Sequence, residues 1–141
     1  MSVNPTVRLV ATLSNLIRRK IDSLEGIDGL TPSQNGILHF ILSRYRERDL
    51  FQKDVEEEFN LRRPTATEIL KLMEKKGLIY REEVPYDARC KKIIATEKGV
   101  RLEEQVLKDI LGMERLVTGG IPREELDAFI ATGMKMINNL K

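Results

Sequence analysis

The sequence predicts a mainly α-helical fold with one β-hairpin, on three observations. Apolar residues recur at steps of three and four along most of the chain, which is the spacing of one helix face. Residues 78–96 carry two strand-forming runs on either side of turn residues. Of the 141 residues, 41% are hydrophobic and 33% are charged, and none is Trp, which suits a helix-rich chain with one core.

The first two expected helices are separated by a break that contains two glycines. Residues 6–24 repeat apolar side chains on one helix face before this break. Thr31 predicts the N-cap of the next helix, with Pro32 in its first turn and Gln34 placed to close a capping box. Loss of such a cap costs about 1 kcal/mol. The second helix is therefore expected to run from this cap to about Tyr45.

A pair of shorter helices joined by a tight turn is expected next. Residues 51–59 place an apolar side chain at every fourth position, which predicts one helix. After a link of two residues, Pro64 suits the first turn of another helix, and Gly77 suits its left-handed end. Two short helices joined in this way form a helix-turn-helix unit.

The β-hairpin follows this unit directly. We expect strands at residues 78–84 and 90–96, joined by a turn at residues 85–89. A hairpin in this place is a wing. A long helix is expected after Gly99, and a last one from Pro122. The predicted fold class is therefore mainly α with an α+β wing, a winged helix-turn-helix with long N-terminal and C-terminal helices.

Few residues suit catalysis or metal binding. The single cysteine and single histidine cannot make an intrachain disulfide, nor a zinc site without carboxylates or a second subunit. No phosphate-binding glycine loop or nucleophile elbow occurs. We therefore expect no enzyme, no cofactor and no metal. Without a signal segment or an apolar run of about 20 residues, we expect a cytoplasmic protein with no membrane partner.

The lone histidine and the lone cysteine each leave two interpretations open. His39 borders an apolar helix face and is interpreted as a half-buried structural residue, the alternative being a ligand contact or a pH switch. Cys90 is interpreted as an ordinary strand cysteine. The alternative is a redox-sensitive thiolate favoured by Arg89 and Lys91 on either side.

Positive charge is concentrated in the middle of the chain. The net charge of +2 says little about partners by itself. Residues 62–92, however, hold nine Lys and Arg against five Asp and Glu, so the rest of the chain is slightly negative. This asymmetry is typical of a module that binds a polyanion.

The fourth expected helix has one face suited to the core and another suited to DNA. Steps of about 100° per residue place Ala66, Ile69, Leu70 and Met73 on the buried side. A helix in the major groove reads bases with its first turns, and an arginine at a hairpin tip can enter the minor groove. The candidate DNA-binding residues are Arg62, Arg63, Pro64, Thr65, Thr67, Glu68, Lys71, Arg89, Lys91 and Lys92. The alternative is that these are ordinary solvated charges.

The stretch from Leu61 to Gly99, LRRPTATEILKLMEKKGLIYREEVPYDARCKKIIATEKG, resembles the recognition helix and wing of the MarR family of bacterial transcription regulators. Asp87 and Arg89 match the D-x-R wing signature of that family, and the order of elements agrees over nearly the whole chain. The resemblance implies that Arg89 contacts the minor groove and that Asp87 supports the wing. It also implies a recognition helix whose side chains face the major groove (Thr65, Thr67, Glu68 and Lys71), with Arg62 and Arg63 near phosphates or base edges.

Two departures from the family pattern are present. Ala95 stands where leucine is usual, which is a small change. The acidic run at residues 56–58 would be repelled by phosphates unless it points away, so it limits how the third helix approaches DNA.

The resemblance also implies an assembly. Residues 1–30 would form an N-terminal dimerisation helix, 31–99 the DNA-binding domain, and 100–141 the C-terminal dimerisation helices, all in one continuous compact unit. The alternative for the apolar stripes is packing within one chain. The expected function is a sequence-specific repressor that binds a pseudo-palindromic operator in double-stranded DNA as a homodimer. A small aromatic effector, which the sequence does not name, would release it; the alternative is a winged-helix protein–protein adaptor without DNA binding.

Overall fold

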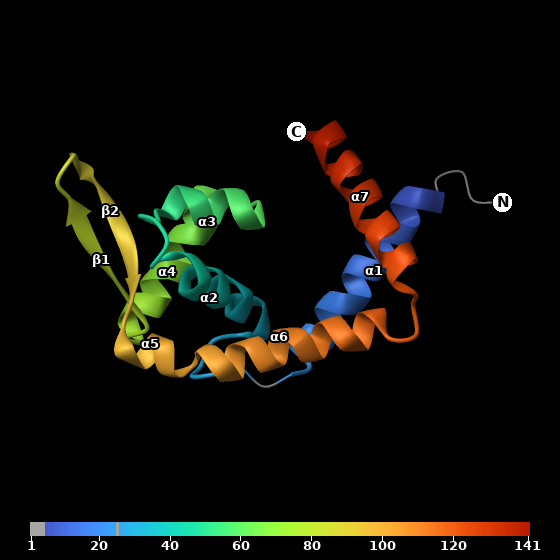
Figure 1. Ribbon diagram of the computed structural model, residues 1–141, viewed down its shortest axis with the longest axis horizontal. Helices are drawn as coiled ribbons and strands as arrows, with labels where there is room; N and C mark the ends of the chain where they lie inside the picture. The colour runs from blue at the N-terminus through green and yellow to red at the C-terminus, as the bar shows by residue number, and fades with distance from the viewer. Residues whose placement is uncertain (1–4, 25) are drawn as a thin grey trace. The chain divides into compact units, whose positions relative to one another are not determined.

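A computed structural model describes residues 5–24 and 26–141, and its elements are shown in Figure 1. They are α1 (Pro5–Asp22), α2 (Pro32–Arg44), α3 (Gln52–Phe59), α4 (Arg63–Lys75), β1 (Ile79–Val84), β2 (Asp87–Ala95), α5 (Glu97–Arg101), α6 (Glu103–Thr118) and α7 (Arg123–Leu140). By packing, the chain divides into two compact units, Met1–Ile110 and Leu111–Lys141. The predicted class, mainly helical with one hairpin, is confirmed.

Helix α2 begins at the predicted capping box. The Thr31 hydroxyl accepts a hydrogen bond from the Gln34 amide at 3.3 Å, and the Gln34 side-chain oxygen accepts one from the Thr31 amide at 3.0 Å. Two backbone donors that the helix leaves without internal partners are thereby satisfied. The cap fixes the point at which the chain enters the core.

One hydrophobic core holds the winged helix-turn-helix together. It takes buried side chains from α2, α4, both strands and the start of α6, among them Leu38, Ile41, Leu70, Met73, Ile79, Ile93 and Val106. The predicted inner face of α4 is confirmed, because Ala66, Leu70 and Met73 are fully buried and Ile69 packs against the core. Burial of this face leaves the opposite side of α4 toward solvent.

The turn between α3 and α4 is as tight as predicted. Asn60 ends α3 in the left-handed conformation, with φ of 50°, which asparagine tolerates better than most residues. The Leu61 amide donates to the Glu56 carbonyl at 2.9 Å. Helix α4 begins at Arg63, one residue before the predicted start, and Gly77 follows it with φ of 73°.

The wing corrects one prediction. The turn contains only Pro85 and Tyr86, whereas residues 85–89 were expected to form it. Strand β2 starts at Asp87, which pairs with Val84, and the next pair is Glu83 with Lys91, so residues 88–90 form a bulge. The bulge forms because the Asp87 carboxylate accepts a hydrogen bond from the Arg89 amide at 3.0 Å, a local alternative to strand pairing.

The wing is also bonded to the loop before α3. The Ile93 amide of β2 donates to the Leu50 carbonyl at 2.6 Å. Leu50 is fully buried, so this bond joins β2 to a residue that is packed in the core. In Figure 1 the hairpin accordingly stands beside α3 and α4.

The long helix expected after Gly99 is two helices in the structure. Helix α5 ends at Arg101, because the Leu102 amide donates to the Gly99 carbonyl three residues back, a tighter turn than an α-helix allows. Helix α6 then begins at Glu103. The apolar periodicity continues across this break, which is why the sequence does not reveal it.

Candidate nucleic-acid interface

Helices α3 and α4 and strand β2 surround a concave surface with a volume of about 680 Å³. We call it the wing pocket; its lining residues are Phe51, Gln52, Lys53, Glu56, Arg63, Thr67, Arg81, Arg89, Cys90 and Lys91. Four predicted site residues meet there, namely Arg63 and Thr67 from α4 and Arg89 and Lys91 from β2. The start of the fourth helix and the wing therefore share one surface.

Positive charge dominates the wing pocket. Five of its lining residues are Lys or Arg, and Glu56 is the acidic one. Clustered cations in a concave surface raise the local concentration of anions. Glu56, from the acidic run in α3, is half-buried on the same wall, so this run does not point entirely away. The surface suits an anion that approaches α4 and the wing more closely than it approaches α3.

The other predicted residues of α4 lie outside the lining of the pocket. Arg62 is the N-cap of the helix. Arg62, Pro64, Thr65, Glu68 and Lys71 are all exposed, and they occupy the first turns and the outer face. The N-terminal end of the helix adds partial positive charge from its unpaired amides. These side chains are free to contact a ligand that covers the helix.

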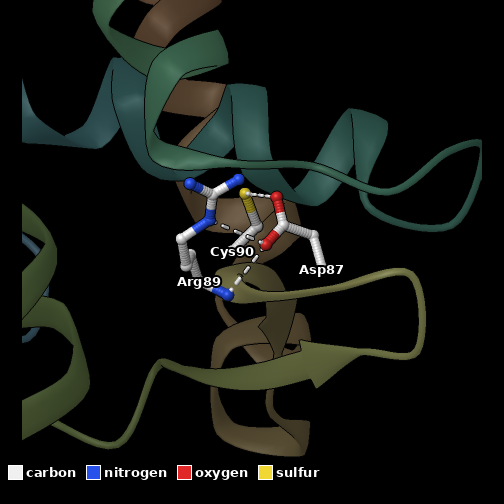
Figure 2. Close-up of polar contacts among 3 residues, drawn as sticks. All are labelled: Asp87, Arg89 and Cys90. Carbon is white, nitrogen blue, oxygen red and sulfur yellow. Dashed lines mark hydrogen bonds and ion pairs between the residues drawn. The ribbon is translucent and has the colours of Figure 1, made fainter.

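The wing bulge is organised by one carboxylate, which Figure 2 shows between its partners. Asp87 Oδ1 accepts from the backbone amide of Arg89 at 3.0 Å and from Arg89 Nε at 3.3 Å, and its Oδ2 accepts from Cys90 Sγ at 3.5 Å. The Arg89 amide, then its side chain and then the Cys90 thiol hold the pKa of Asp87 below its usual value. These contacts favour the ionised form of Asp87.

Arg89 is held at its base and free at its end. Its Nε faces Asp87, yet the side chain as a whole is 91% exposed. Within residues 5–24 and 26–141, its two terminal nitrogens have no hydrogen-bond partner. The guanidinium is thus directed outward by the bulge, with most of its donors available to an anion.

The two consecutive lysines of β2 lie on opposite faces of the strand, as strand alternation requires. Lys91 lines the wing pocket. Lys92 is half-buried on the other face, with its Nζ 3.8 Å from the Asp49 carboxylate. Tyr86 donates to the same carboxylate at 2.8 Å, and this hydrogen bond is the main reason that the pKa of Tyr86 is raised.

Six lining residues are not among the predicted DNA-binding residues: Phe51, Gln52, Lys53, Glu56, Arg81 and Cys90. Gln52 and Lys53 begin α3, and Arg81 lies on the side of β1 that faces the helices. The Gln52 side chain donates to Thr67 and accepts from Arg81, which is 29 residues away. Such long-range contacts leave no local spacing signal. Arg81 did leave one signal: it lies two residues after Ile79, and strand alternation places both side chains on the same face of β1, the one on which Ile79 is buried.

The structure weighs against the thiolate alternative for Cys90. The side chain is exposed, and the hydrogen bond to Asp87 is the largest of the effects that raise the pKa of its thiol. The charge of Arg89 acts in the opposite direction and is outweighed. The direction of this shift favours the interpretation of Cys90 as an ordinary strand cysteine. His39 is half-buried, and its carbonyl accepts from the Ser43 hydroxyl at 2.8 Å.

Two further properties concern only the residues that the structure describes. None of their helices combines the length and the apolar character that crossing a bilayer demands. Their His, Cys, Asp and Glu side chains form no group of three that could hold a metal ion.

Known proteins similar to the chain agree on its family. The family model described as the MarR family matches residues 28–89. The transcription regulator MarR from Oenococcus oeni is 31% identical, with a TM-score of 0.77, over 93% of this chain and 97% of that one. MepR from S. aureus, solved in complex with DNA, is 25% identical, with a TM-score of 0.83, over 95% and 97% of the two chains.

A more distant structure has the same fold. PcaV from Streptomyces coelicolor, solved with its natural ligand, is 19% identical, with a TM-score of 0.77, over 100% of this chain and 98% of that one. Among curated protein sequences, none matches the chain. The winged helix-turn-helix, its D-x-R bulge and the identity to the Oenococcus oeni regulator lead to one conclusion: the chain belongs to the MarR family of transcription regulators.

Proposed function

We propose that this regulator is a sequence-specific repressor that binds a pseudo-palindromic operator as a homodimer. The observation that carries the proposal is the wing pocket, where side chains from α4 and from the wing meet on one cationic surface. A duplex that places α4 in its major groove also brings the adjacent minor groove to the wing. The solved complex of MepR with DNA supports the same use of this fold.

Each predicted site residue receives a role in this proposal. The exposed face of α4 contacts the major groove through Arg62, Arg63, Pro64, Thr65, Thr67, Glu68 and Lys71. Arg89 enters the minor groove, where narrow, electronegative sequences attract arginine. Asp87 supports Arg89, and Lys91 and Lys92 contact phosphates, which position the protein without reading sequence. Lys92 would have to leave Asp49 to do so, and an exposed ion pair of this kind is worth only about 0–1 kcal/mol.

Dimerisation is proposed through the terminal helices, in residues 1–30 and 100–141. Helices α1 and α7 are 18 residues each and bury none of the side chains described in them. Large exposed apolar side chains on such helices are typical of an interface. Two-fold symmetry would present two recognition helices about 34–36 Å apart, which is why the operator is expected to be palindromic.

A small aromatic effector completes the proposal. It would bind the dimer and change the spacing of the recognition helices, which releases the operator. PcaV, which has the same fold, was solved with its natural ligand, so the fold accommodates a ligand in that protein. An effector acts only by binding the released form more tightly than the DNA-bound form.

DNA binding is tested by fluorescence anisotropy with DNA from the chain's own promoter region, at several salt concentrations. Specific affinity should fall steeply as salt rises, because counterions are released when phosphates are contacted. Arg89→Ala should weaken binding to all operator sequences by about tenfold or more. The matched control is Arg46→Ala, which removes the same charge from an exposed position outside the wing pocket and the terminal helices, and which should bind as the parent does.

Two results would contradict the proposal. If Arg89→Ala binds as tightly as the parent, the wing does not hold DNA. If no sequence is preferred at any salt concentration, the adaptor alternative is favoured instead.

A further inference from the structure

Gln52 lies at the centre of a hydrogen-bond chain that joins the wing to α4. Its side-chain oxygen accepts from Arg81 Nη1 of β1 at 3.3 Å. Its side-chain nitrogen donates to the Thr67 hydroxyl of α4 at 2.8 Å and to the Arg63 carbonyl at 3.4 Å. Residues from three different elements are thus connected through one amide.

The orientation of the Gln52 amide is determined by its partners. A guanidinium can only donate, so the amide oxygen must face Arg81. The Arg63 carbonyl can only accept, so the amide nitrogen must face α4. Both requirements give the same orientation. The exchange of amide oxygen and nitrogen that is open to many glutamines is therefore excluded here.

Arg81 is itself anchored to α4. Its Nε lies 3.0 Å from a carboxylate oxygen of Glu74. The contact is an ion pair rather than a hydrogen bond, because among the described residues this nitrogen has no acceptor in line with its N–H. Glu74 thus holds the guanidinium whose terminal nitrogen reaches Gln52.

The fixed amide determines what the Thr67 hydroxyl can do. That oxygen accepts the Gln52 hydrogen bond, which leaves its own proton free. A threonine within a helix commonly donates this proton to the carbonyl four residues back. Here that carbonyl belongs to Arg63, and Gln52 bonds to it instead. Across the part of the chain that the structure describes, the Thr67 hydroxyl finds no acceptor of its own.

We infer that Gln52 is a positioning residue that makes Thr67 a hydrogen-bond donor toward DNA. The inference rests on the proposed function, with α4 in the major groove. Guanine N7 and O6, adenine N7 and thymine O4 accept hydrogen bonds in that groove, whereas cytosine presents the N4 donor. Thr67 therefore selects an accepting base edge over cytosine at one position in each half-site.

A charge-changing variant reverses the polarity of this chain. In Gln52→Glu the new carboxylate still accepts from Arg81, but it cannot donate. The Thr67 hydroxyl must then give its proton to the carboxylate and offer only lone pairs to DNA. The preferred base at the Thr67 position should move from guanine or thymine toward cytosine, whose N4 group donates.

The experiment measures affinity for a set of operators that carry each of the four bases at each half-site position. For the parent, cytosine at the Thr67 position should weaken binding about three- to tenfold, the value of one hydrogen bond. Thr67→Val should remove this preference and leave the other positions unchanged. Gln52→Glu should invert the preference at that position alone.

The matched control separates charge from polarity. Lys53→Gln changes the charge by the same amount at the neighbouring residue, which also lines the wing pocket. It should weaken binding to every operator equally, without a change in base preference. In the double variant Thr67→Val with Gln52→Glu, the inversion should disappear, because the hydroxyl that carries it is missing. Circular dichroism confirms that each variant is folded.

The outcomes distinguish the inference from the proposed function. A parent protein without sequence preference contradicts both. A parent with a clear preference, together with Gln52→Glu that keeps it, overturns the role of Gln52 and leaves operator binding intact. Inversion that persists in the double variant also overturns it, since Thr67 would then not be the residue that reads the base.

Discussion

Asp87 accepts hydrogen bonds from two neighbouring side chains, those of Arg89 and Cys90. It directs the base of the Arg89 guanidinium and raises the pKa of the Cys90 thiol through a hydrogen bond. The carboxylate is partly exposed, so its ion pair with Arg89 contributes little to stability and mainly fixes the position of the Arg89 side chain. One side chain thereby shapes the tip of the wing and favours the thiol form of the cysteine beside it.

Alkylation of Cys90 tests this role of Asp87. A raised pKa lowers the fraction of thiolate, the reactive form, at any pH below that pKa. Asp87→Asn should lower the pKa of Cys90 and increase its rate of reaction with iodoacetamide at pH 8. The control is Glu83→Gln, a neighbouring wing carboxylate that should leave the rate unchanged. A rate in Asp87→Asn equal to or below that of the parent would contradict the assigned cause.

Prediction from sequence succeeds for residues whose signal is local. Asp87 and Arg89 lie two positions apart in a recognisable wing signature, and Thr31 with Gln34 forms a capping box within four residues. The partners of Gln52 lie 11, 15 and 29 residues away, so only the folded chain brings them together.

Helices α4 and α5 form one joint at the scale of elements. The Lys76 carbonyl accepts from Lys98 Nζ at 2.8 Å, and the Gly77 carbonyl accepts from the Thr96 hydroxyl at 2.5 Å. The Leu78 carbonyl accepts from the Thr96 amide at 3.0 Å. Three carbonyls at the end of the recognition helix are therefore satisfied by residues that begin α5.

Gly99 makes this close approach possible. A Cβ at this position would lie 2.3 Å from the Leu78 carbonyl oxygen, which is backbone and cannot turn aside. Gly99→Ala should lower the free energy of unfolding by about 1–3 kcal/mol, the usual effect of overpacking. Gly36→Ala is the control, since its Cβ would meet the Phe59 ring at an ordinary 3.7 Å within α2. It should stabilise by about 0.5–1 kcal/mol.

Urea denaturation of both variants measures these changes. If Gly99→Ala and the parent have equal free energies of unfolding, the backbone around Gly99 and Leu78 can move apart to accept a methyl group without loss of stability. The long helix expected after Gly99 is present as α6, but it begins only at Glu103, because the Leu102 amide bonds to the Gly99 carbonyl and interrupts the helix. Apolar periodicity records no such backbone bond. The bulge in β2 was missed in the same way, because a side chain, rather than turn composition, produces it.

At the scale of the whole molecule, the terminal helices carry apolar surface that the single chain does not cover. In α7, Phe129, Ile130, Met134 and Ile137 are each about half exposed, at 57, 58, 53 and 45%. Water contact with so many apolar side chains is unfavourable. The sequence predicts these stripes well, since helical spacing is a local property, but the proposed partner that would cover them lies outside any one chain.

A charge in the α7 stripe tests dimerisation. Ile130→Glu would bury a carboxylate in the proposed interface, so it should give a monomer in sedimentation experiments and weaken operator binding. Lys135→Glu places a carboxylate on the opposite face of the helix with a charge change of two units instead of one, and it should still leave the dimer unchanged. A dimeric Ile130→Glu variant would exclude this stripe from the interface.

The bond between the Ile93 amide and the Leu50 carbonyl has a consequence for many copies of the protein at once. A hairpin normally offers an open strand edge, to which the same strand of another molecule can add. Here the outward-facing Ile93 amide, near the end of β2, is already occupied. A neighbouring wing would have to displace it before stacking could begin. The β2 edge of each hairpin is therefore hindered from pairing with the wing of another molecule in a concentrated solution.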